Sequence, residues 1–122
     1  MSGTWIHHGH IRLLKKASKY GKVVVALTTD KEIKRFKNYN PEMNYSQRKE
    51  VIQSICYVSK VVPSKAILND KFLKKYKIDL LVHGNDNKNQ VNEKSLLIFR
   101  RTKNISSHLL RKRAAKILQR IN

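Results

Sequence analysis

The chain has 122 residues and carries 27 Lys and Arg against 8 Asp and Glu, a formal net charge of +19. With 40% hydrophobic and 29% charged residues, the composition is typical of a globular protein, and the length fits one domain over 1–122. A single cysteine, Cys56, excludes an intramolecular disulfide framework. We expect no secretory leader and no membrane span, and therefore a cytoplasmic protein.

The positive charge is concentrated at the two ends of the chain. Residues 1–29 carry five Lys or Arg and no acid, residues 95–122 carry eight and no acid, and all eight acids lie in 30–94. If the fold brings the two ends together, they form a surface that attracts anions. A solvated, lysine-rich surface is the alternative interpretation of the same charge.

Helical and strand patterns alternate from the N-terminus onward. A helix is predicted over 10–20, with Gly21 at the position that commonly ends a helix. A strand over 22–28 follows, and it is β-branched and almost entirely apolar, as in strands buried on both faces. A short helix over 30–37, opened by Asp30 as its cap, leads into a loop.

The remaining elements alternate in the same way. They are a helix over 46–55 with Val51, Ile52 and Ile55 facing inward, a strand over 57–62 closed by Pro63, a helix over 69–77 capped by Asn69 or Asp70, a strand over 78–83, a strand over 95–99 and a helix over 105–121. The last helix has an apolar stripe opposite strongly basic faces. This alternation predicts a Rossmann-like α/β fold: a three-layer α/β/α arrangement around a mostly parallel sheet of about four to five strands, covered by helices on both faces.

A ligand of such a fold lies at the carboxyl ends of the strands, beside helix N-termini. The segment His7-His8-Gly9-His10 stands directly before the first predicted helix. Histidines three apart at a helix start point to one place, Gly9 lets a ligand approach the backbone, and the first-turn amides favour an anion. This pattern predicts a phosphate site. Surface histidines, a tag remnant and a chance metal site are the alternatives, and no zinc-ligand spacing accompanies the segment.

Three further segments carry candidate ligand contacts. Residues 100–107 follow a strand with two arginines and lead with hydroxyl groups into the last helix, either as an anion site or simply as a helix cap. Residues 83–86 end a strand, where Asp86 is placed to bind a sugar hydroxyl or a metal unless the segment is a plain loop. The bases within 34–37 form either a lid over phosphates or a solvated face.

The order of these segments resembles the cytidylyltransferase branch of the HxGH nucleotidyltransferases. H-x-G-H before a helix, T-T-D after a strand, R-K at a helix start, V-H-G-N-D at a strand end and R-T-x-x-I-S-S before the last helix occur in that order from Ser2 to around Ala114. Within this branch the chain is most similar to glycerol-3-phosphate cytidylyltransferases, which are short single-domain enzymes.

The resemblance implies a reaction and its partners. Members of this family transfer CMP from CTP to a phosphorylated alcohol and release pyrophosphate, so we expect CTP, Mg²⁺ and most of all sn-glycerol 3-phosphate, giving CDP-glycerol. The family also suggests a homodimer, with no specific nucleic-acid partner. Because the acceptor's own phosphate is the nucleophile, the transfer requires positioning and positive charge and no catalytic triad.

The matching motifs assign expected roles to individual residues. The catalytic contacts are expected from His7, His10, Lys37 and Arg101. The nucleotide contacts are expected from Thr4, Gly9, His10, Asp86, Arg101, Thr102, Ile105, Ser106 and Ser107. The phosphate of the acceptor is expected to meet Lys34, Lys37 and Arg48, and no metal site made of protein ligands is implied.

Three departures from the family bear on activity. A whole strand usually precedes the G-T turn, in the middle of the sheet, whereas two residues precede Gly3 here. The turn between Thr4 and His7 is also shorter than usual, and Asn104 replaces a glycine. A truncated, inactive homologue fits these departures. The sequence is also compatible with a phosphoethanolamine or phosphocholine cytidylyltransferase, an ATP-using sugar-phosphate adenylyltransferase or a basic nucleic-acid-binding module.

Overall fold

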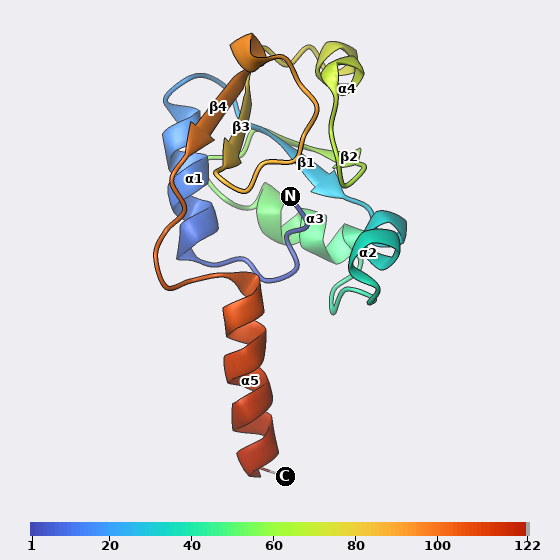
Figure 1. Ribbon diagram of the computed structural model, residues 1–122, viewed down its shortest axis with the longest axis vertical. Helices are drawn as coiled ribbons and strands as arrows, with labels where there is room; N and C mark the ends of the chain where they lie inside the picture. The colour runs from blue at the N-terminus through green and yellow to red at the C-terminus, as the bar shows by residue number, and fades with distance from the viewer. Residues whose placement is uncertain (122) are drawn as a thin grey trace.

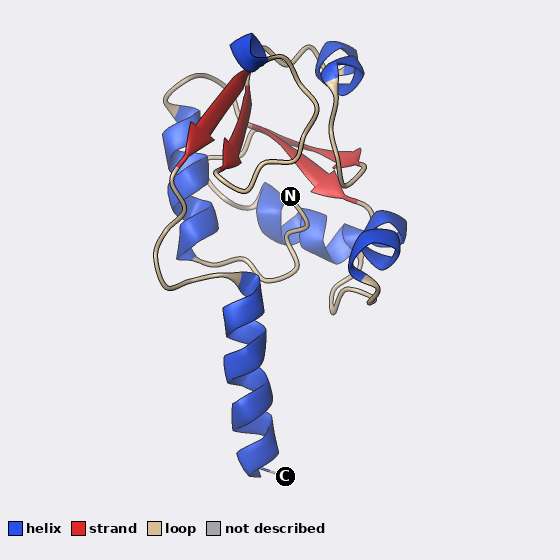
Figure 2. Ribbon diagram, in the orientation of Figure 1, coloured by secondary structure: helices blue, strands red, loops and turns tan. Residues whose placement is uncertain are grey.

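Helices and parallel strands alternate along the chain in the computed structural model, which describes residues 1–121 (Figure 1; Figure 2). The elements are α1 (His8–Ser18), β1 (Val24–Thr28), α2 (Asp30–Lys37), α3 (Tyr45–Gln53), β2 (Lys60–Ser64), α4 (Asp70–Lys75), β3 (Leu81–Gly84), the 3₁₀ helix η1 (Glu93–Ser95), β4 (Leu96–Phe99) and α5 (Ser107–Ile121). Every predicted helix and strand is present, most of them with displaced ends.

The strands pair in parallel, as predicted. β1 pairs with β2, with Val24 opposite Lys60, and β3 pairs with β4, with Leu81 opposite Leu96. Parallel pairs connected through helices confirm the Rossmann-like α/β class. The structure differs from the predicted continuous sheet of four to five strands, because the two pairs form separate two-stranded sheets.

Met1 lies against the edge of β1 that the β1–β2 pair leaves open. The α-amine of Met1 donates a hydrogen bond to the carbonyl oxygen of Ala26 (2.8 Å), and the N–H of Thr28 donates to the carbonyl oxygen of Met1 (2.8 Å). Met1 therefore pairs in parallel with the edge of β1 that faces away from β2. Val24 and Ala26 are half-buried, as are all four residues of β3. Among the described residues, no strand connects β1 to β3.

The hydrophobic core lies between β1, α1 and α3. Leu27 and Ile52 are completely buried, and Leu14 and Val25 are nearly so, in one contiguous cluster. Val51 was predicted to face this core, but its side chain is 40% exposed. Ile52 faces inward as predicted, and Val51 does not, because successive residues of a helix are separated by about 100° around its axis.

The end of β2 and the cap of α2 are among the features that differ from the predicted ones. β2 continues through Pro63, which was expected to close it. Pro63 is exposed and lies in a two-stranded sheet. Its missing N–H therefore does not deprive a further strand of a hydrogen-bond donor. At the start of α2, the hydroxyl of Thr29 accepts a hydrogen bond from the N–H of Glu32 (3.4 Å), so Thr29 and not Asp30 is the cap.

The last helix, α5, projects away from the body of the molecule (Figure 1). None of its residues is buried, and Ile117, Leu118 and Ile121 are 55%, 57% and 74% exposed. The prediction that helices cover both faces of the sheet therefore fails for α5, whose apolar stripe is largely exposed. Within residues 1–121, no helix combines the length and apolar character needed to cross a membrane.

Candidate active site at the start of α1

The two outer histidines of the His7-His8-Gly9-His10 segment form the cap of α1. The N–H of Gly9 donates to Nδ1 of His7 (3.1 Å), and the N–H of His7 donates to Nδ1 of His10 (3.1 Å). These reciprocal bonds make a capping box in which imidazoles replace the usual hydroxyl and carboxylate. Because Nδ1 is the acceptor in both rings, the proton of each neutral imidazole lies on Nε2. Both rings therefore retain an Nε2–H donor for a ligand.

The surroundings of the two rings keep them neutral. Burial lowers the pKa of His10 to about 4, with further contributions from the positive charges of His7, the Met1 amine and Arg101. Burial also lowers the pKa of His7, assisted by His8 and Arg101. The ring centroids of His7 and His10 are 3.9 Å apart. At neutral pH the helix start thus presents two adjacent uncharged donors.

This electrostatic arrangement predicts a loss of stability in acid. The unfolded chain binds protons at His10 near its ordinary pKa of 6.5 and the folded chain only near 4, so the melting temperature is expected to fall as pH decreases from about 6.5 to 4. The buried Met1 amine, whose pKa is lowered from 8.0 to about 6, adds a second window at higher pH. Thermal melts of the parent chain and His10→Asn between pH 8 and 4 test this expectation. If the melting temperature falls equally between pH 6.5 and 4 in both proteins, the role of His10 is contradicted. The fall at higher pH, which comes from the Met1 amine, should persist in the variant.

The fold brings three distant segments of the sequence to this helix start. A Cβ on Gly9 would lie 2.8 Å from the His7 ring and 3.4 Å from Ile105, so the 101–107 segment passes directly over the glycine. At the end of β3, a Cβ on Gly84 would lie 3.4 Å from Arg101. Arg101 also lies 3.6 Å from Asp86. The structure therefore places the predicted histidine, aspartate and arginine segments around one site, as their positions at strand ends suggested.

The hydroxyl groups before α5 have identifiable partners. Oγ of Ser106 accepts a hydrogen bond from the N–H of Leu109 (3.1 Å), which is the simple helix-cap role left open by the sequence. Oγ of Ser107 donates to the carbonyl oxygen of Trp5 (3.1 Å) and joins α5 to the turn before His7. Thr102 is half-buried in the same segment. Contact of these residues with a nucleotide stays a prediction.

Thr4 is buried in the turn that precedes the histidine cap. Its side chain is 2% exposed, and its hydroxyl has no hydrogen-bond partner among the described residues. It lines a hollow of about 400 Å³ together with Trp5, Glu42 and Met43. The hydroxyl of Thr4 therefore has a free hydrogen-bonding capacity, and its contact with a nucleotide stays a prediction.

The three residues expected to meet the acceptor phosphate divide into two groups. Lys34 and Lys37 are exposed on α2, where Nζ of Lys37 lies 3.3 Å from the hydroxyl of Ser2. Arg48 is 0% exposed. Its guanidinium donates to the carbonyl oxygens of Ser2, Thr28 and Met43 and to Asp30 Oδ1, at 2.6 to 3.1 Å. The assignment of Arg48 to the substrate phosphate is corrected, because its donors are used to hold the N-terminal segment to the end of β1.

Asp30, the partner of Arg48, has a role that the sequence did not show. One of its carboxylate oxygens pairs with Arg48 (2.6 Å), and the other accepts a hydrogen bond from the N–H of Tyr45 (3.1 Å). Asp30 therefore joins the start of α2 to the start of α3. Asp30 follows a buried strand, a position that suits a helix cap equally well. No local sequence pattern distinguishes a cap from a residue that joins two helices.

The acidic residues at the site bear on how Mg²⁺ fits. No group of three or more His, Cys, Asp or Glu side chains within 1–121 is placed to hold a metal ion. The carboxylate of Asp86 lies 3.7 Å from His83 and 3.6 Å from Arg101. Mg²⁺ usually keeps several waters and binds through one or two carboxylates plus substrate phosphates. The described residues offer no set of protein ligands for Mg²⁺, so an ion at this site would be held mainly by the phosphates of a bound nucleotide.

Comparison with known families identifies the relatives of this arrangement. A family model described as cytidylyltransferase-like matches residues 5–113, which include the histidine cap and the whole segment before α5. The chain belongs to the cytidylyltransferase-like family. The resemblance seen in its motifs, to the cytidylyltransferase branch of the nucleotidyltransferases, is thereby confirmed.

Relatives with named activities lie within this cytidylyltransferase-like family. The chain is 37% identical over 83 residues to the glycerol-3-phosphate cytidylyltransferase of Staphylococcus aureus, covering 66% of this chain and 62% of the relative. It is 36% identical to the protein of the same name from Bacillus subtilis, covering 66% and 64%. The matched part of the chain thus spans less than two thirds of the length of these relatives.

A solved structure supports the fold of this family member. The crystal structure of the lipopolysaccharide core biosynthesis protein from Thermoplasma volcanium superposes with a TM-score of 0.68, covering 84% of this chain and 93% of the other. The two sequences are 20% identical, so this similarity concerns the fold alone.

Proposed function

We propose that the chain transfers CMP from CTP to a small phosphorylated alcohol, with sn-glycerol 3-phosphate as the favoured acceptor, in the cytoplasm. An oxygen of the acceptor phosphate attacks the α-phosphorus of CTP, the bond from that phosphorus to the oxygen bridging to the β-phosphorus breaks, and pyrophosphate leaves with the electron pair. The observation that carries this proposal is the pair of neutral imidazoles, each with a free Nε2–H, beside Arg101 at the start of α1.

The proposed work of the site is to orient and stabilise phosphate charge. Nε2–H groups of His7 and His10 donate to phosphate oxygens, and the guanidinium of Arg101 adds a fixed positive charge at the same place. Neutral donors held by a capping box need no reorganisation as charge develops, which is the main source of catalytic power in such transfers. Mg²⁺, when bound to the triphosphate, neutralises part of its charge.

Further contacts extend this proposal to the nucleotide and the acceptor. Asp86, Thr102 and the 105–107 segment are proposed to bind the nucleotide, since Ile105 lies against Gly9 and Asp86 lies 3.6 Å from Arg101. Lys34 and Lys37 are proposed to close over the acceptor phosphate, since α2 carries them exposed. We also propose a homodimer, as the resemblance of the motifs to the family suggests, and its mass in solution tests this.

The choice of nucleotide is tested by thermal stability. CTP with Mg²⁺ is expected to raise the melting temperature, and ATP with Mg²⁺ is expected to raise it less, because a ligand that binds the native state alone stabilises it by mass action. The R-T-x-x-I-S-S segment, which resembles the CTP-using members of the family, motivates this expectation. An equal or larger shift with ATP would overturn the CTP assignment.

The reaction itself is tested by pyrophosphate release. CTP and ATP are each combined with glycerol 3-phosphate, phosphoethanolamine, phosphocholine and a sugar phosphate. Release with CTP and glycerol 3-phosphate above all other pairs supports the proposal. If pyrophosphate release is greatest with another acceptor, that compound takes the place of glycerol 3-phosphate as the proposed substrate. Salt-sensitive binding of arbitrary duplex DNA without CTP binding would favour a nucleic-acid-binding module.

A further inference from the structure

The outer half of α5 carries an apolar face that the rest of the described chain leaves open. Ile117, Leu118 and Ile121 are 55%, 57% and 74% exposed, and together with Leu110 and Ala114 they follow the spacing of one helix face. Figure 1 shows α5 extending away from the two sheets and the other helices. Exposed apolar patches bordered by polar residues commonly mark interaction sites, so this face calls for a partner.

The inner end of α5 is attached to the body of the molecule. Oγ of Ser107 donates to the carbonyl oxygen of Trp5 (3.1 Å). One turn later, the guanidinium of Arg111 donates to Oε2 of Glu42 (2.9 Å), and its Cζ lies 4.2 Å from the centre of the Tyr39 ring. The 15 residues of α5 span about 22 Å. These contacts fix the start of the helix, so its outer half is presented to the surroundings.

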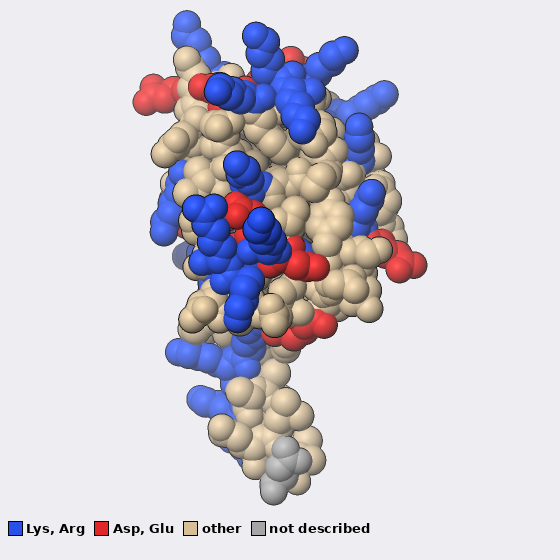
Figure 3. All heavy atoms as spheres, turned by 90° about the vertical axis from the view of Figure 1, so that its right-hand side faces the viewer, with Lys and Arg blue, Asp and Glu red and all other residues tan. Residues whose placement is uncertain are grey.

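The polar faces of α5 are exclusively basic. Four of its Lys and Arg side chains are exposed, namely Lys112, Arg113, Lys116 and Arg120. Residues 94–122 contain no Asp or Glu. Figure 3 shows Lys and Arg along one side of the projecting part and uncharged atoms along the side next to it. The charge of this helix therefore complements a negative surface, and its other face complements an apolar layer.

The surface of an anionic lipid bilayer supplies both features at once. An amphipathic helix with a basic polar face lies in the plane of the membrane, with its apolar side chains at the boundary of the acyl chains. Clusters of four or more Lys and Arg on such a helix are typical of binding to anionic lipids.

Other occupants match the helix less completely. Two copies of α5 packed face to face would bring their basic residues together, with no acid in either helix to pair with them. Nucleic acid would account for the basic residues, because its phosphates attract them, but not for three exposed Ile and Leu side chains. The lipid surface accounts for both faces of the helix.

We propose that α5 binds the surface of an anionic lipid bilayer. The three exposed apolar side chains of its outer half insert below the headgroups, and its four exposed basic residues contact the lipid phosphates. The helix lies in the interface and does not cross the bilayer. This inference goes beyond the proposed cytidylyl transfer and does not depend on it, since binding is measured without nucleotide or acceptor.

The test is sedimentation of the full chain with lipid vesicles at physiological ionic strength. Vesicles of phosphatidylglycerol and phosphatidylcholine in equal parts are compared with vesicles of phosphatidylcholine alone. Half-maximal binding to the anionic vesicles is expected at a lipid concentration at least roughly tenfold lower, because each basic residue near a negative surface adds to the affinity. Equal binding to both kinds of vesicle, or binding to neither, would overturn the proposal.

A change in the apolar face separates insertion from attraction between a chain of net charge +19 and a negative surface. Leu118→Gln keeps every charge and is expected to weaken binding to anionic vesicles roughly tenfold, because one inserted side chain is lost. The control is Ile98→Thr, which alters an apolar side chain on β4 that is 42% exposed, and it should bind like the parent chain. Unchanged binding by Leu118→Gln would exclude insertion of α5.

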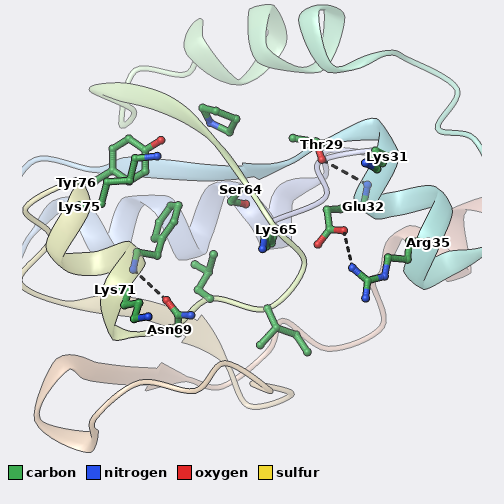
Figure 4. A pocket seen from close by; sticks show the side chains of 14 residues that line it. Thr29, Lys31, Glu32, Arg35, Ser64, Lys65, Asn69, Lys71, Lys75 and Tyr76 are labelled. Atoms are coloured by element: carbon green, nitrogen blue, oxygen red, sulfur yellow. Dashed lines mark hydrogen bonds and ion pairs between the residues drawn. The ribbon is translucent and has the colours of Figure 1, made fainter.

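A change in charge has its own matched control. Lys116→Gln combined with Arg120→Gln is expected to weaken binding to anionic vesicles roughly tenfold. Lys65→Gln combined with Lys71→Gln removes the same charge from a different cationic surface, the hollow where β1 and β2 end (Figure 4). Equal weakening by the two double variants would show that the whole chain's charge acts and α5 does not.

Two further results would assign α5 to another occupant. If anionic vesicles are not bound and Leu118→Gln converts a dimer into a monomer in light scattering, a second copy covers the apolar face. If duplex DNA is bound and anionic vesicles are not, the basic residues serve nucleic acid. Either result overturns the lipid proposal.

Discussion

Replacing His10 with alanine is expected to reduce turnover by about two to three orders of magnitude, the loss typical of removing one donor to a transition state. The Nε2–H of His10 is free for a ligand because its Nδ1 accepts from the N–H of His7 (3.1 Å). Binding of CTP should weaken far less, since the donor is most valuable where charge develops. Steady-state pyrophosphate release and a separate CTP titration measure the two effects.

The control for this variant is a neighbouring histidine. His8 is exposed and lies outside the capping box, so His8→Ala should turn over CTP at nearly the parent rate. His10→Ala also removes a cap contact, and a thermal melt of each variant separates loss of folding from loss of chemistry. If His10→Ala turns over normally and only binds CTP more weakly, then His10 contacts the ground state and the proposed mechanism is wrong.

Extending the chain before Met1 by about five β-branched residues, the length of β1, is expected to raise the melting temperature by roughly 10 °C or more. Met1 already pairs with Ala26 and Thr28, so added residues continue along the same edge of β1 and meet β3 on their other side. Several new backbone hydrogen bonds at about 1 kcal/mol each account for the gain. The extension also converts the buried amine of Met1, whose pKa is lowered to about 6, into an uncharged amide.

An extension of the same length with alternating prolines is the matched control, because proline cannot donate to neighbouring strands. Its melting temperature should stay near that of the parent chain. Lengthening the turn between Thr4 and His7 by two residues, combined with the apolar extension, is expected to give the highest turnover. Equal melting temperatures for the apolar and proline extensions would show that β1 and β3 do not accept a strand between them. Parent turnover on the order of 10 per second would show that the short N-terminal segment suffices for activity.

The local elements and the start of the candidate site could be predicted from the sequence because their causes are local. The apolar run before Thr28 is a buried strand in any α/β context, and the spacing of His7 and His10 at a helix start makes both rings face one place. The order of the motifs was sufficient to indicate the family. The positions of Arg101 and Asp86 followed from the rule that parallel strands end at one edge of the sheet.

Contacts between distant segments were decided only by the tertiary structure. Arg48 has the same sequence context whether it binds a phosphate or a backbone carbonyl, and burial against Ser2 and Thr28 makes the choice. Likewise, the apolar stripe of α5 predicts a covered face but not what covers it, and the helix projects from the body. The division of the sheet has the same origin. Strand pairing depends on which segments occupy neighbouring positions in space, and Met1 reaches one end of β1 without bridging to β3.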